Sequence, residues 1–471
     1  MTQTVLYETV ADSISGMISE GTLRPGERVP SVRRLSTQRR VSVATVLRAY
    51  EVLENRGLIE ARPNAGYYVR HRARLADEPS ISNPPKAAQL VGISALVQDV
   101  LDSRRPGIMS FGTACPPPEY MPTGKLQRLI SSIARRKPLS LTQYVLPPGN
   151  EELRRQIARR SLDLGCNLAA KDIIVTNGAM EAMNLCLRAV AKPGDTVALE
   201  SPTYFGLLQT LESLGIKALE IPTHPREGIS LDALEFALDR SKIAAVIAMP
   251  NAQNPLGFTM SDENKKRLVR VLDKRSVPLI EDDVYGDLHY GDDRALPAKA
   301  FDRSGNVMLC SSFTKTLAPG FRLGWVAPGR WHAQVQMLKF INSVGCPEIL
   351  QLVIAEFLAS GGYDRQLRSL RRVFRDQVAH MSSAISQYFP EGTRITRPAG
   401  GFILWVELPE GRDSVELFRQ ALRNNISFGP GVLFTATDRY RNCVRIGCAE
   451  AWSPKVEQAV ARLGELAGKQ R

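Results

Sequence analysis

One lysine, Lys315, lies in a stretch that disfavours a charged amine. Residues 311–325 read SSFTKTLAPGFRLGW, a run of small, hydroxyl-bearing and apolar residues that also contains Arg322. Burial in such surroundings lowers the pKa of a lysine, and a neutral lysine amine attacks carbonyl groups. We therefore predict that Lys315 forms a covalent bond with the aldehyde of a cofactor.

The other candidate site residues each follow a short apolar run that is typical of a strand. The runs DIIVTN, TVALESP, IAAVIAMP, VPLIE and VMLC alternate with helical patterns, which predicts a parallel sheet covered by helices. In such sheets, ligands bind beyond the carboxyl ends of the strands. The residues expected there are Gly178, Ala179, Tyr204, Asn254, Asp282, Tyr285, Ser312 and Lys315.

These side chains meet the chemical needs of the ring of pyridoxal 5'-phosphate. The aldehyde requires a reactive amine, which Lys315 supplies by forming an internal aldimine. The pyridine nitrogen requires a carboxylate that keeps it protonated, and Asp282 is suited to this role. The ring oxygen requires hydrogen bonds, for which Asn254 and Tyr285 are suited. Tyr204 offers an aromatic ring to the face of the cofactor.

The phosphate of the cofactor needs a different set of partners. A phosphate dianion is bound by backbone N–H groups at the N-terminus of a helix and by a cationic side chain. The small residues after DIIVTN open a helix, and Arg322 supplies the cation. The expected phosphate ligands are Gly178, Ala179, Ser312 and Arg322.

The order of these motifs resembles that of fold-type I aminotransferases. The order is Gly-Ala, Tyr, Asn-Pro-x-Gly, Asp-x-x-Tyr, Ser-x-x-Lys and Arg, within residues 105–471. The resemblance implies an α/β domain with a central, mostly parallel sheet over about 105–330. It also implies a smaller α+β part over about 331–471.

The resemblance assigns roles to Tyr144, Arg445 and Gly112, and it gives Asn254 a second role. Tyr144, in TQYVLPPGNEELRRQIA, would reach the phosphate bound by a partner subunit. Arg445, in CVRIGCA, would bind the α-carboxylate of a substrate or effector through its planar fork. Gly112 and Asn254 would lie beside the same ligand.

The N-terminal seventy residues have a different pattern. Apolar spacing and caps predict three helices over 6–20, 31–38 and 41–57, and then a hairpin over 58–69 with its turn at 64–66. Residues 1–72 hold eleven arginines, no lysine and seven acidic residues, so this segment has a net charge of +4. Three helices followed by a hairpin, with this charge, predict a winged helix-turn-helix that binds double-stranded DNA.

Residues 21–69 resemble the winged helix of GntR-type regulators. The shared pattern includes Leu-x-Pro-Gly, Pro-Ser-x-Arg-x-Leu, Val-Ser-x-x-Thr-Val and a glycine in the wing. Val43 stands where many relatives carry a base-reading arginine, and Arg48 lies further along the same helix. The residues expected at the DNA are Arg33, Ser42, Thr45, Arg48 and Gly66, with Arg28 or Arg34 at a phosphate.

The combination of the two parts resembles the MocR-type subfamily of GntR regulators. The predicted organisation is a DNA-binding domain over 1–72, a linker over 73–104 and a pyridoxal phosphate-binding domain over 105–471. The subfamily implies a homodimer in which the N-terminal domain of one chain packs on the large domain of the other. We expect this large domain to sense pyridoxal phosphate itself, an amino acid or amine effector, or both. A pyridoxal phosphate-dependent aminotransferase with an appended DNA-binding domain stays open as the alternative.

Composition restricts the remaining possibilities. A chain of 471 residues with 44% hydrophobic and 23% charged residues predicts two or three folded domains. The net charge of +13 is compatible with a polyanionic partner. The seven cysteines include no Cys-x-x-Cys pair, so we expect reduced thiols and no metal site. We find no signal peptide and no uncharged apolar run of about 18 residues, which leads us to expect a cytoplasmic protein.

Overall fold

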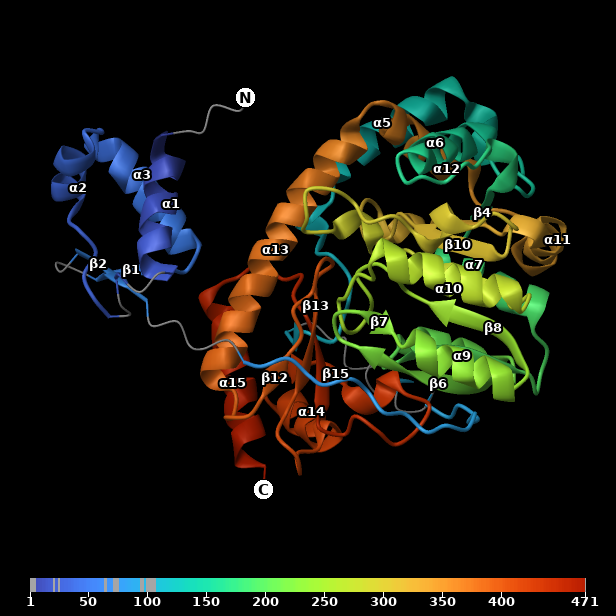
Figure 1. Ribbon diagram of the computed structural model, residues 1–471. Coiled ribbons are helices and arrows are strands. Elements are labelled where there is room, and N and C mark those ends of the chain that lie inside the picture. The colour runs from blue at the N-terminus through green and yellow to red at the C-terminus, as the bar shows by residue number, and fades with distance from the viewer. Residues whose placement is uncertain are drawn as a thin grey trace. The chain divides into compact units, whose positions relative to one another are not determined.

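The computed structural model divides the chain into two compact units, Met1–Leu75 and Ala76–Arg471 (Figure 1). The structure describes residues 6–19, 22–23, 26–62, 66–70, 76–93, 97–98 and 107–470. The division after Leu75 lies close to residue 72, where the sequence predicts the end of the DNA-binding domain. Each unit has its own hydrophobic core.

The first unit consists of three helices and a two-stranded antiparallel sheet, as the sequence predicts. Ser31 and Ser42 cap the second and third helices, because their hydroxyls accept hydrogen bonds from the amides of Arg34 (3.4 Å) and Thr45 (3.0 Å). The core of this unit includes Val46 and Tyr50, which are buried residues of the third helix. The turn of the wing at 63–65 lies outside the described residues. The elements are α1 Leu6–Ser19, α2 Val32–Arg39, α3 Val43–Asn55, β1 Ile59–Arg62 and β2 Gly66–Val69.

The second unit is built on an eight-stranded sheet in the order β4-β11-β10-β9-β8-β5-β6-β7. Strands β5, β6, β8, β9 and β10 are parallel to their neighbours in this group, whereas β7 and β11 pair in antiparallel fashion. The prediction of a mostly parallel sheet is confirmed. The strands are β4 Ile174–Thr176, β5 Thr196–Ser201, β6 Lys217–His224, β7 Gly228–Ile229, β8 Ile243–Ala248, β9 Leu279–Asp282, β10 Val307–Ser312 and β11 Gly324–Ala327.

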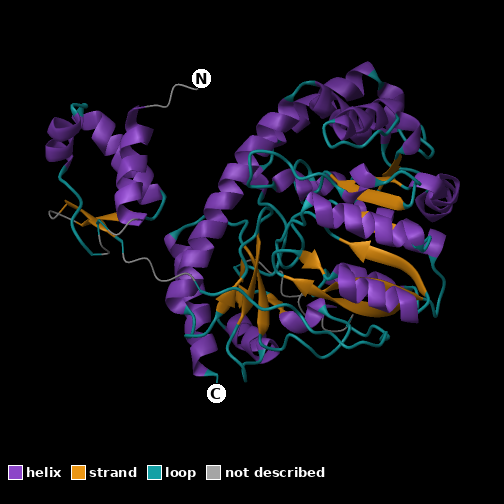
Figure 2. Ribbon diagram, viewed as in Figure 1, coloured by secondary structure: helices purple, strands orange, loops and turns teal. Residues whose placement is uncertain are grey.

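Helices cover this sheet because its strands are apolar on both faces (Figure 2). α7 packs against β9, β10 and β11, while α12 packs against α5 and α6. Across the described residues, no helix combines the length and the apolar character that crossing a membrane requires. The helices of this large part are α5 Thr123–Arg136, α6 Glu151–Leu162, α7 Ala179–Val190, α8 Phe205–Ser213, α9 Leu231–Arg240, α10 Asp262–Lys274, α11 His332–Ser343 and α12 Glu348–Ala359.

A 27-residue helix, α13 Gly362–Tyr388, leads from this large part to a smaller α+β part. The smaller part holds a four-stranded sheet in the order β12-β13-β16-β15, packed with two helices. The predicted C-terminal α+β part is therefore present. Its elements are β12 Arg394–Ile395, β13 Ile403–Glu407, α14 Ser414–Arg423, β14 Ile426–Ser427, β15 Gly429–Pro430, β16 Cys443–Gly447 and α15 Pro454–Lys469, with β14 paired to β3 Met109–Ser110.

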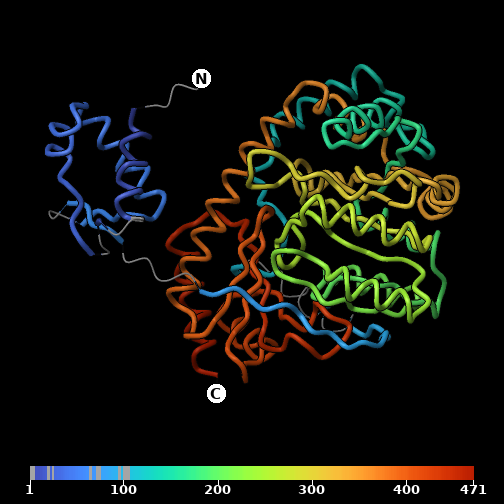
Figure 3. The backbone as a smooth tube through the Cα atoms, in the orientation of Figure 1, coloured from blue at the N-terminus to red at the C-terminus, as the bar shows by residue number. Residues whose placement is uncertain are grey.

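Residues 76–93, which lie within the predicted linker, run in extended form along the second unit (Figure 3). The amide of Ala76 donates to Ser386 Oγ (3.2 Å) near the end of α13. Ser82 exchanges hydrogen bonds with the backbone of Thr223, and Gln89 bridges to Ala218 on β6. The proline-rich composition of this segment gave no indication of these contacts.

Candidate functional site

A cradle for an anion lies where β4 leads into α7. Gly178, with φ +82°, precedes the first turn of α7, so the N–H groups of that turn are directed at one point. Arg322 lies against this glycine, because a Cβ at Gly178 would be 2.6 Å from Arg322 Nη2. Arg322 Nη1 also donates to Thr314 Oγ1 (3.4 Å). Glycine at 178 therefore leaves room for the guanidinium beside the helix N-terminus.

Lys315 lies beyond the carboxyl end of β10 and is partly buried. Its Nζ donates a hydrogen bond to the carbonyl oxygen of Ala114 and lies 5.8 Å from the ring centre of Tyr285. Burial is the main reason that the pKa of Lys315 falls to about 8, and the positive charge of Arg445 acts in the same direction. The amine is thus partly neutral near neutral pH, as nucleophilic attack on an aldehyde requires.

Asp282, the last residue of β9, is completely enclosed beside this lysine. Its Oδ1 accepts a hydrogen bond from the amide of Val284 (3.2 Å). Burial raises the pKa of Asp282 to about 7, and the positive charge of Lys315 acts in the opposite direction. A buried carboxylate with this pKa gains stability from a bound cation, and a protonated pyridine nitrogen is such a cation.

Two buried polar atoms in the site have no hydrogen-bond partner among the described residues. They are Asn254 Oδ1 and the hydroxyl oxygen of Tyr285. Burial also raises the pKa of Tyr285, so its hydroxyl stays protonated and can donate. Burying such a group without a partner costs about 1–3 kcal/mol. A ligand atom that bonds to both would remove this cost, which fits the ring oxygen of pyridoxal phosphate.

Asn254 is held by two residues that the sequence analysis did not identify. Gln253 donates to Glu200 Oε2 (3.1 Å) and accepts from the amide of Leu256 (2.7 Å), and this fixes the turn. Glu200 is fully buried, and burial raises its pKa to about 7. A glutamate inside the apolar run TVALESP was the available signal for this position.

Tyr204 and Arg445 come from the large and small parts of the unit. Tyr204 directly precedes α8, and its ring lies over Gly206, where a Cβ would approach it to 2.6 Å. Arg445, on β16, is 2% exposed, and its Nη2 donates to the carbonyl oxygen of Gly112. The guanidinium lies over the ring of Phe434, at 5.0 Å from its centre. Arg445 influences the pKa of both Lys315 and Tyr285, which places it beside them.

The structure therefore brings most of the predicted site residues together from separate strand ends. Ala179 and Ser312 are buried at the start of α7 and the end of β10. Tyr144 is different, because 84% of its surface is exposed and it is not enclosed in the site of its own chain.

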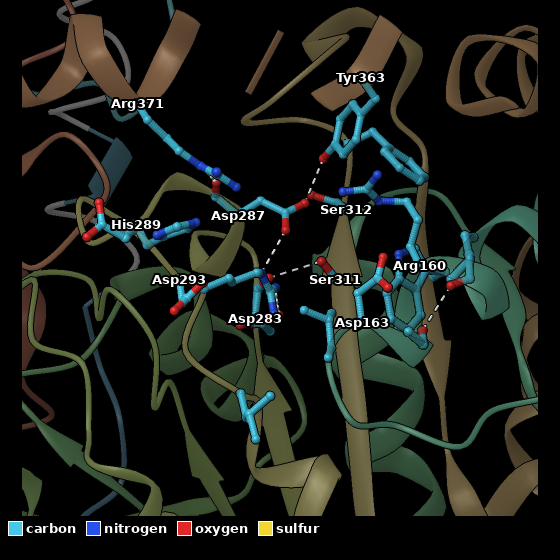
Figure 4. Close-up of a pocket in the computed structure, with 18 residues that line it drawn as sticks. Arg160, Asp163, Asp283, Asp287, His289, Asp293, Ser311, Ser312, Tyr363 and Arg371 are labelled. Carbon is cyan, nitrogen blue, oxygen red and sulfur yellow. Dashed lines mark hydrogen bonds and ion pairs between the residues drawn. The ribbon is translucent and has the colours of Figure 1, made fainter. Parts of the chain in front are cut away.

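A polar cavity of about 450 Å³ lies on the side of Asp283 and Ser311 (Figure 4). Its charged groups bond to one another: Arg294 pairs with Asp283 and with Asp287 (2.7 Å), and Tyr363 donates to Asp287 (2.9 Å). The Tyr363 hydroxyl also forms a hydrogen bond (2.8 Å) with the hydroxyl of Thr316, the residue that follows Lys315. This network links the loop of Lys315 to α13.

In the first unit, the candidate DNA contacts lie around α2, α3 and the wing. Arg33, Arg34 and Arg48 are exposed. Ser42 and Thr45 bond to each other through their hydroxyls (2.8 Å), so the cap of α3 already engages both. Arg28 lies against Gly66, where a Cβ would be 3.1 Å from its Nη2. These are the side chains that the sequence predicts at the DNA.

Comparisons with known proteins match the first unit and the second unit to two different families. Residues 119–463 match the family described as aminotransferase class I and II, and residues 6–69 match the bacterial regulatory proteins of the gntR family. The chain is 40% identical over 462 residues to the HTH-type transcriptional regulator YdcR of Escherichia coli K12, with 98% of both chains covered. YjiR of the same organism is 40% identical over 461 residues, again with 98% of both covered.

The second unit is also similar to solved aminotransferase structures. One is LysN, the alpha-aminoadipate aminotransferase of Thermus thermophilus, in complex with N-(5'-phosphopyridoxyl)-L-leucine. The TM-score is 0.73 at 29% identity, and the match covers 79% of this chain and 94% of that one. Another is a kynurenine aminotransferase of Pyrococcus horikoshii, with a TM-score of 0.75 at 27% identity, covering 80% and 94%.

Proposed function

Since the chain belongs to the aminotransferase class I and II family and carries a GntR-type DNA-binding domain, we propose that its second unit senses an amino acid or amine and controls DNA binding. Aminotransferases of this fold depend on pyridoxal phosphate. The observation that carries the proposal is that two buried atoms beside Lys315 and Asp282, Asn254 Oδ1 and Tyr285 Oη, have no hydrogen-bond partner within the described part of the chain. The residues of this chain fit the cofactor.

Each part of the cofactor has a partner in this chain. When bound, pyridoxal phosphate supplies an electron-withdrawing ring and an aldehyde that reacts with amines. Lys315 holds the aldehyde, and Asp282 keeps a proton at the ring nitrogen. Asn254 and Tyr285 orient the ring oxygen, and Tyr204 covers the ring. Four residues bind the phosphate: Gly178, Ala179, Ser312 and Arg322.

The effector binds between the large and small parts of the unit. Arg445 offers its fork to the effector's carboxylate, in place of its bond to the Gly112 carbonyl. The effector's amine meets the cofactor at Lys315, which lies on the large part. A ligand that contacts both parts favours whichever arrangement lets it make both sets of contacts. This differential affinity is the energy available for changing DNA binding.

DNA is bound through the first unit, with α3 in the major groove. Arg33, Ser42, Thr45, Arg48 and Gly66 contact the DNA, and Arg28 or Arg34 contacts a phosphate. Residues 73–104 connect this domain to residues 105–471. We place the protein in the cytoplasm, where it has access to DNA.

The functional form is a homodimer. Tyr144 is 84% exposed, and its neighbours Leu139 and Leu141 are 60% and 58% exposed. On α11, Met337 and Ile341 are 60% and 66% exposed. Large exposed apolar side chains are typical of surfaces that another chain covers. In the dimer, Tyr144 reaches the phosphate bound by the other chain, and the N-terminal domain of each chain packs on the large domain of its partner.

Mixed dimers test the role of Tyr144. We expect Tyr144→Ala and Lys315→Ala each to weaken or abolish cofactor binding, and a mixture of the two variants to restore one intact site per heterodimer. The measurement is the absorbance of lysine-bound cofactor after subunit exchange. If mixing restores nothing while the two variants exchange subunits, Tyr144 does not act across the interface.

Absorbance titration tests the sensor function against the alternative, an aminotransferase. Lys315, Asp282 and Arg445 are all present, so the site retains what amino-group transfer requires. For a sensor, we expect an amino acid to shift the cofactor band once, without release of a keto acid. Repeated cycling with 2-oxoglutarate and accumulation of keto acid at about 1 s⁻¹ or faster would instead establish the enzyme. If no amino acid or amine in the titration alters the band or DNA binding, the proposed sensor is wrong.

A further inference from the structure

The outer face of α13 carries a stripe of arginines that the site does not use. We define the α13 stripe as Arg365, Arg368, Arg372 and Arg375, all of which are exposed. Their spacing of three, four and three residues places them within one narrow arc of the helix. The opposite face of α13 is buried and includes Leu367, Leu370 and Phe374. The stripe therefore lies on the exposed side of α13, whose course through the second unit is seen in Figure 1.

Within the part of the chain that the structure describes, no acidic side chain forms an ion pair with the stripe. The helix has two acidic residues: Asp364 pairs with Arg160 (2.7 Å), and Asp376 lies beside the last arginine of the stripe. Arg371 is turned away from the stripe, because its Nε donates to the carbonyl oxygen of Asp287 (2.8 Å) at the cavity in Figure 4.

The dimensions and chemistry of the stripe fit a nucleic-acid backbone. Ten residues of α-helix span about 15 Å, and one DNA strand presents a phosphate about every 3.4 Å along the axis. The stripe is thus long enough to reach more than one phosphate of a DNA strand. All four residues are arginines, whose forked donors bind phosphate oxygens in pairs. A polyanion is the partner that such a row of unpaired cations attracts most strongly.

The chain supplies this polyanion through its own first unit. The first unit is the GntR-type domain, and the chain enters the second unit at Ala76, which bonds to Ser386 on α13 itself. DNA bound by the first unit is therefore held by the same chain as the stripe. We propose that the α13 stripe is a second DNA-contact surface, which binds phosphates of the DNA that the winged helix holds.

The test compares two triple variants of the full-length protein loaded with pyridoxal phosphate. One is Arg365→Gln, Arg368→Gln and Arg372→Gln. The matched control, on α10, is Lys266→Gln, Arg270→Gln and Lys274→Gln, which removes the same charge from exposed positions of another helix. Glutamine has a helix propensity close to that of arginine and lysine, so both helices stay formed. The probe is a fluorescein-labelled 40-base-pair duplex, measured by anisotropy from 50 to 200 mM KCl.

We expect the stripe variant to bind more weakly and with a shallower dependence on salt. Each lost phosphate contact reduces the slope of log K against log salt by about 0.9, or roughly 2.7 for three contacts. Over this salt range the wild type then loses roughly 40-fold more affinity than the variant does. The α10 control should keep the wild-type slope.

Three outcomes would overturn the proposal. They are an unchanged slope in the stripe variant, an equal reduction in both variants, or a change in oligomeric mass confined to the stripe variant. The last would show that the stripe contacts another copy of the chain. If the wild type showed no salt-dependent binding at all, the DNA-binding role of the first unit would fail instead.

Discussion

Burial lowers the pKa of Lys315 to about 8, and this shift makes cofactor attachment depend on pH in a specific way. At pH 7.5, a lysine with this pKa is roughly one-quarter neutral, whereas an ordinary lysine with a pKa of about 10.4 is about 0.1% neutral. The reactive fraction is therefore roughly 200-fold larger. When pyridoxal phosphate is added to cofactor-free protein, we expect the rate of covalent attachment to rise with pH and level off above about pH 8.

Stopped-flow absorbance between pH 6 and 10.5 measures this rate, and borohydride reduction followed by mass spectrometry identifies the lysine. Lys315→Ala should abolish attachment at this position, whereas Lys217→Ala, at an exposed position of β6, should leave the rate unchanged. Arg445→Leu should move the inflection to higher pH, since the charge of Arg445 lowers the pKa of Lys315. A rate that keeps rising beyond pH 10, or an inflection that persists in Lys315→Ala, would refute the reasoning.

Three further predictions concern Asp282, the hydrogen bond of Tyr440 and the DNA-binding unit. Burial raises the pKa of Asp282 from 3.8 to about 7, so ionising this carboxyl costs stability as pH rises from about 4 to 7. Cofactor-free Asp282→Asn should therefore be more stable than the wild type at pH 8, by up to about 4 kcal/mol in urea unfolding, while its affinity for pyridoxal phosphate falls; equal or lower stability would contradict this. Tyr440→Phe removes a hydrogen bond to Ser201 Oγ (2.8 Å) but keeps the ring against Trp405. We expect thermal unfolding to show that the free energy of unfolding falls by about 1 kcal/mol. An unchanged free energy of unfolding would show that this hydrogen bond does not stabilise the fold. Arg33→Ala should weaken DNA binding and reduce its salt slope by about 1, with the cofactor absorbance unchanged; wild-type affinity in this variant would remove Arg33 from the DNA interface.

Most candidate residues of the cofactor site were identifiable from the sequence because they lie at or just beyond the carboxyl ends of apolar strands. In a parallel sheet, the carboxyl ends of strands meet at one edge, so a local pattern indicates a shared location. Gly178, Asp282 and Lys315 could be named in this way although they are far apart in the chain. The DNA-binding unit was equally accessible, since its helices, caps and wing follow one another within seventy residues.

Other features depend on contacts between distant segments, which no periodic pattern records. Glu200 supports Asn254 through Gln253, and this requires β5 to lie beside the turn after β8. The docking of residues 76–93 on β6 and α13 likewise has no local signal, because extended polar segments look alike in sequence whether they are bound or free. Tyr144 lies exposed on its own chain, so its predicted role needs a second copy.

Local patterns of side chains in the sequence predict the two-part organisation, the mostly parallel sheet and the order of the candidate cofactor-binding residues. Only the tertiary structure decided the chemical state of the site. Burial sets the pKa of Lys315 near 8 and that of Asp282 near 7, and it leaves Asn254 Oδ1 and the Tyr285 hydroxyl without a partner among the described residues. The energy of a charge or a hydrogen bond depends on everything packed around it, and that packing exists only once distant segments have come together.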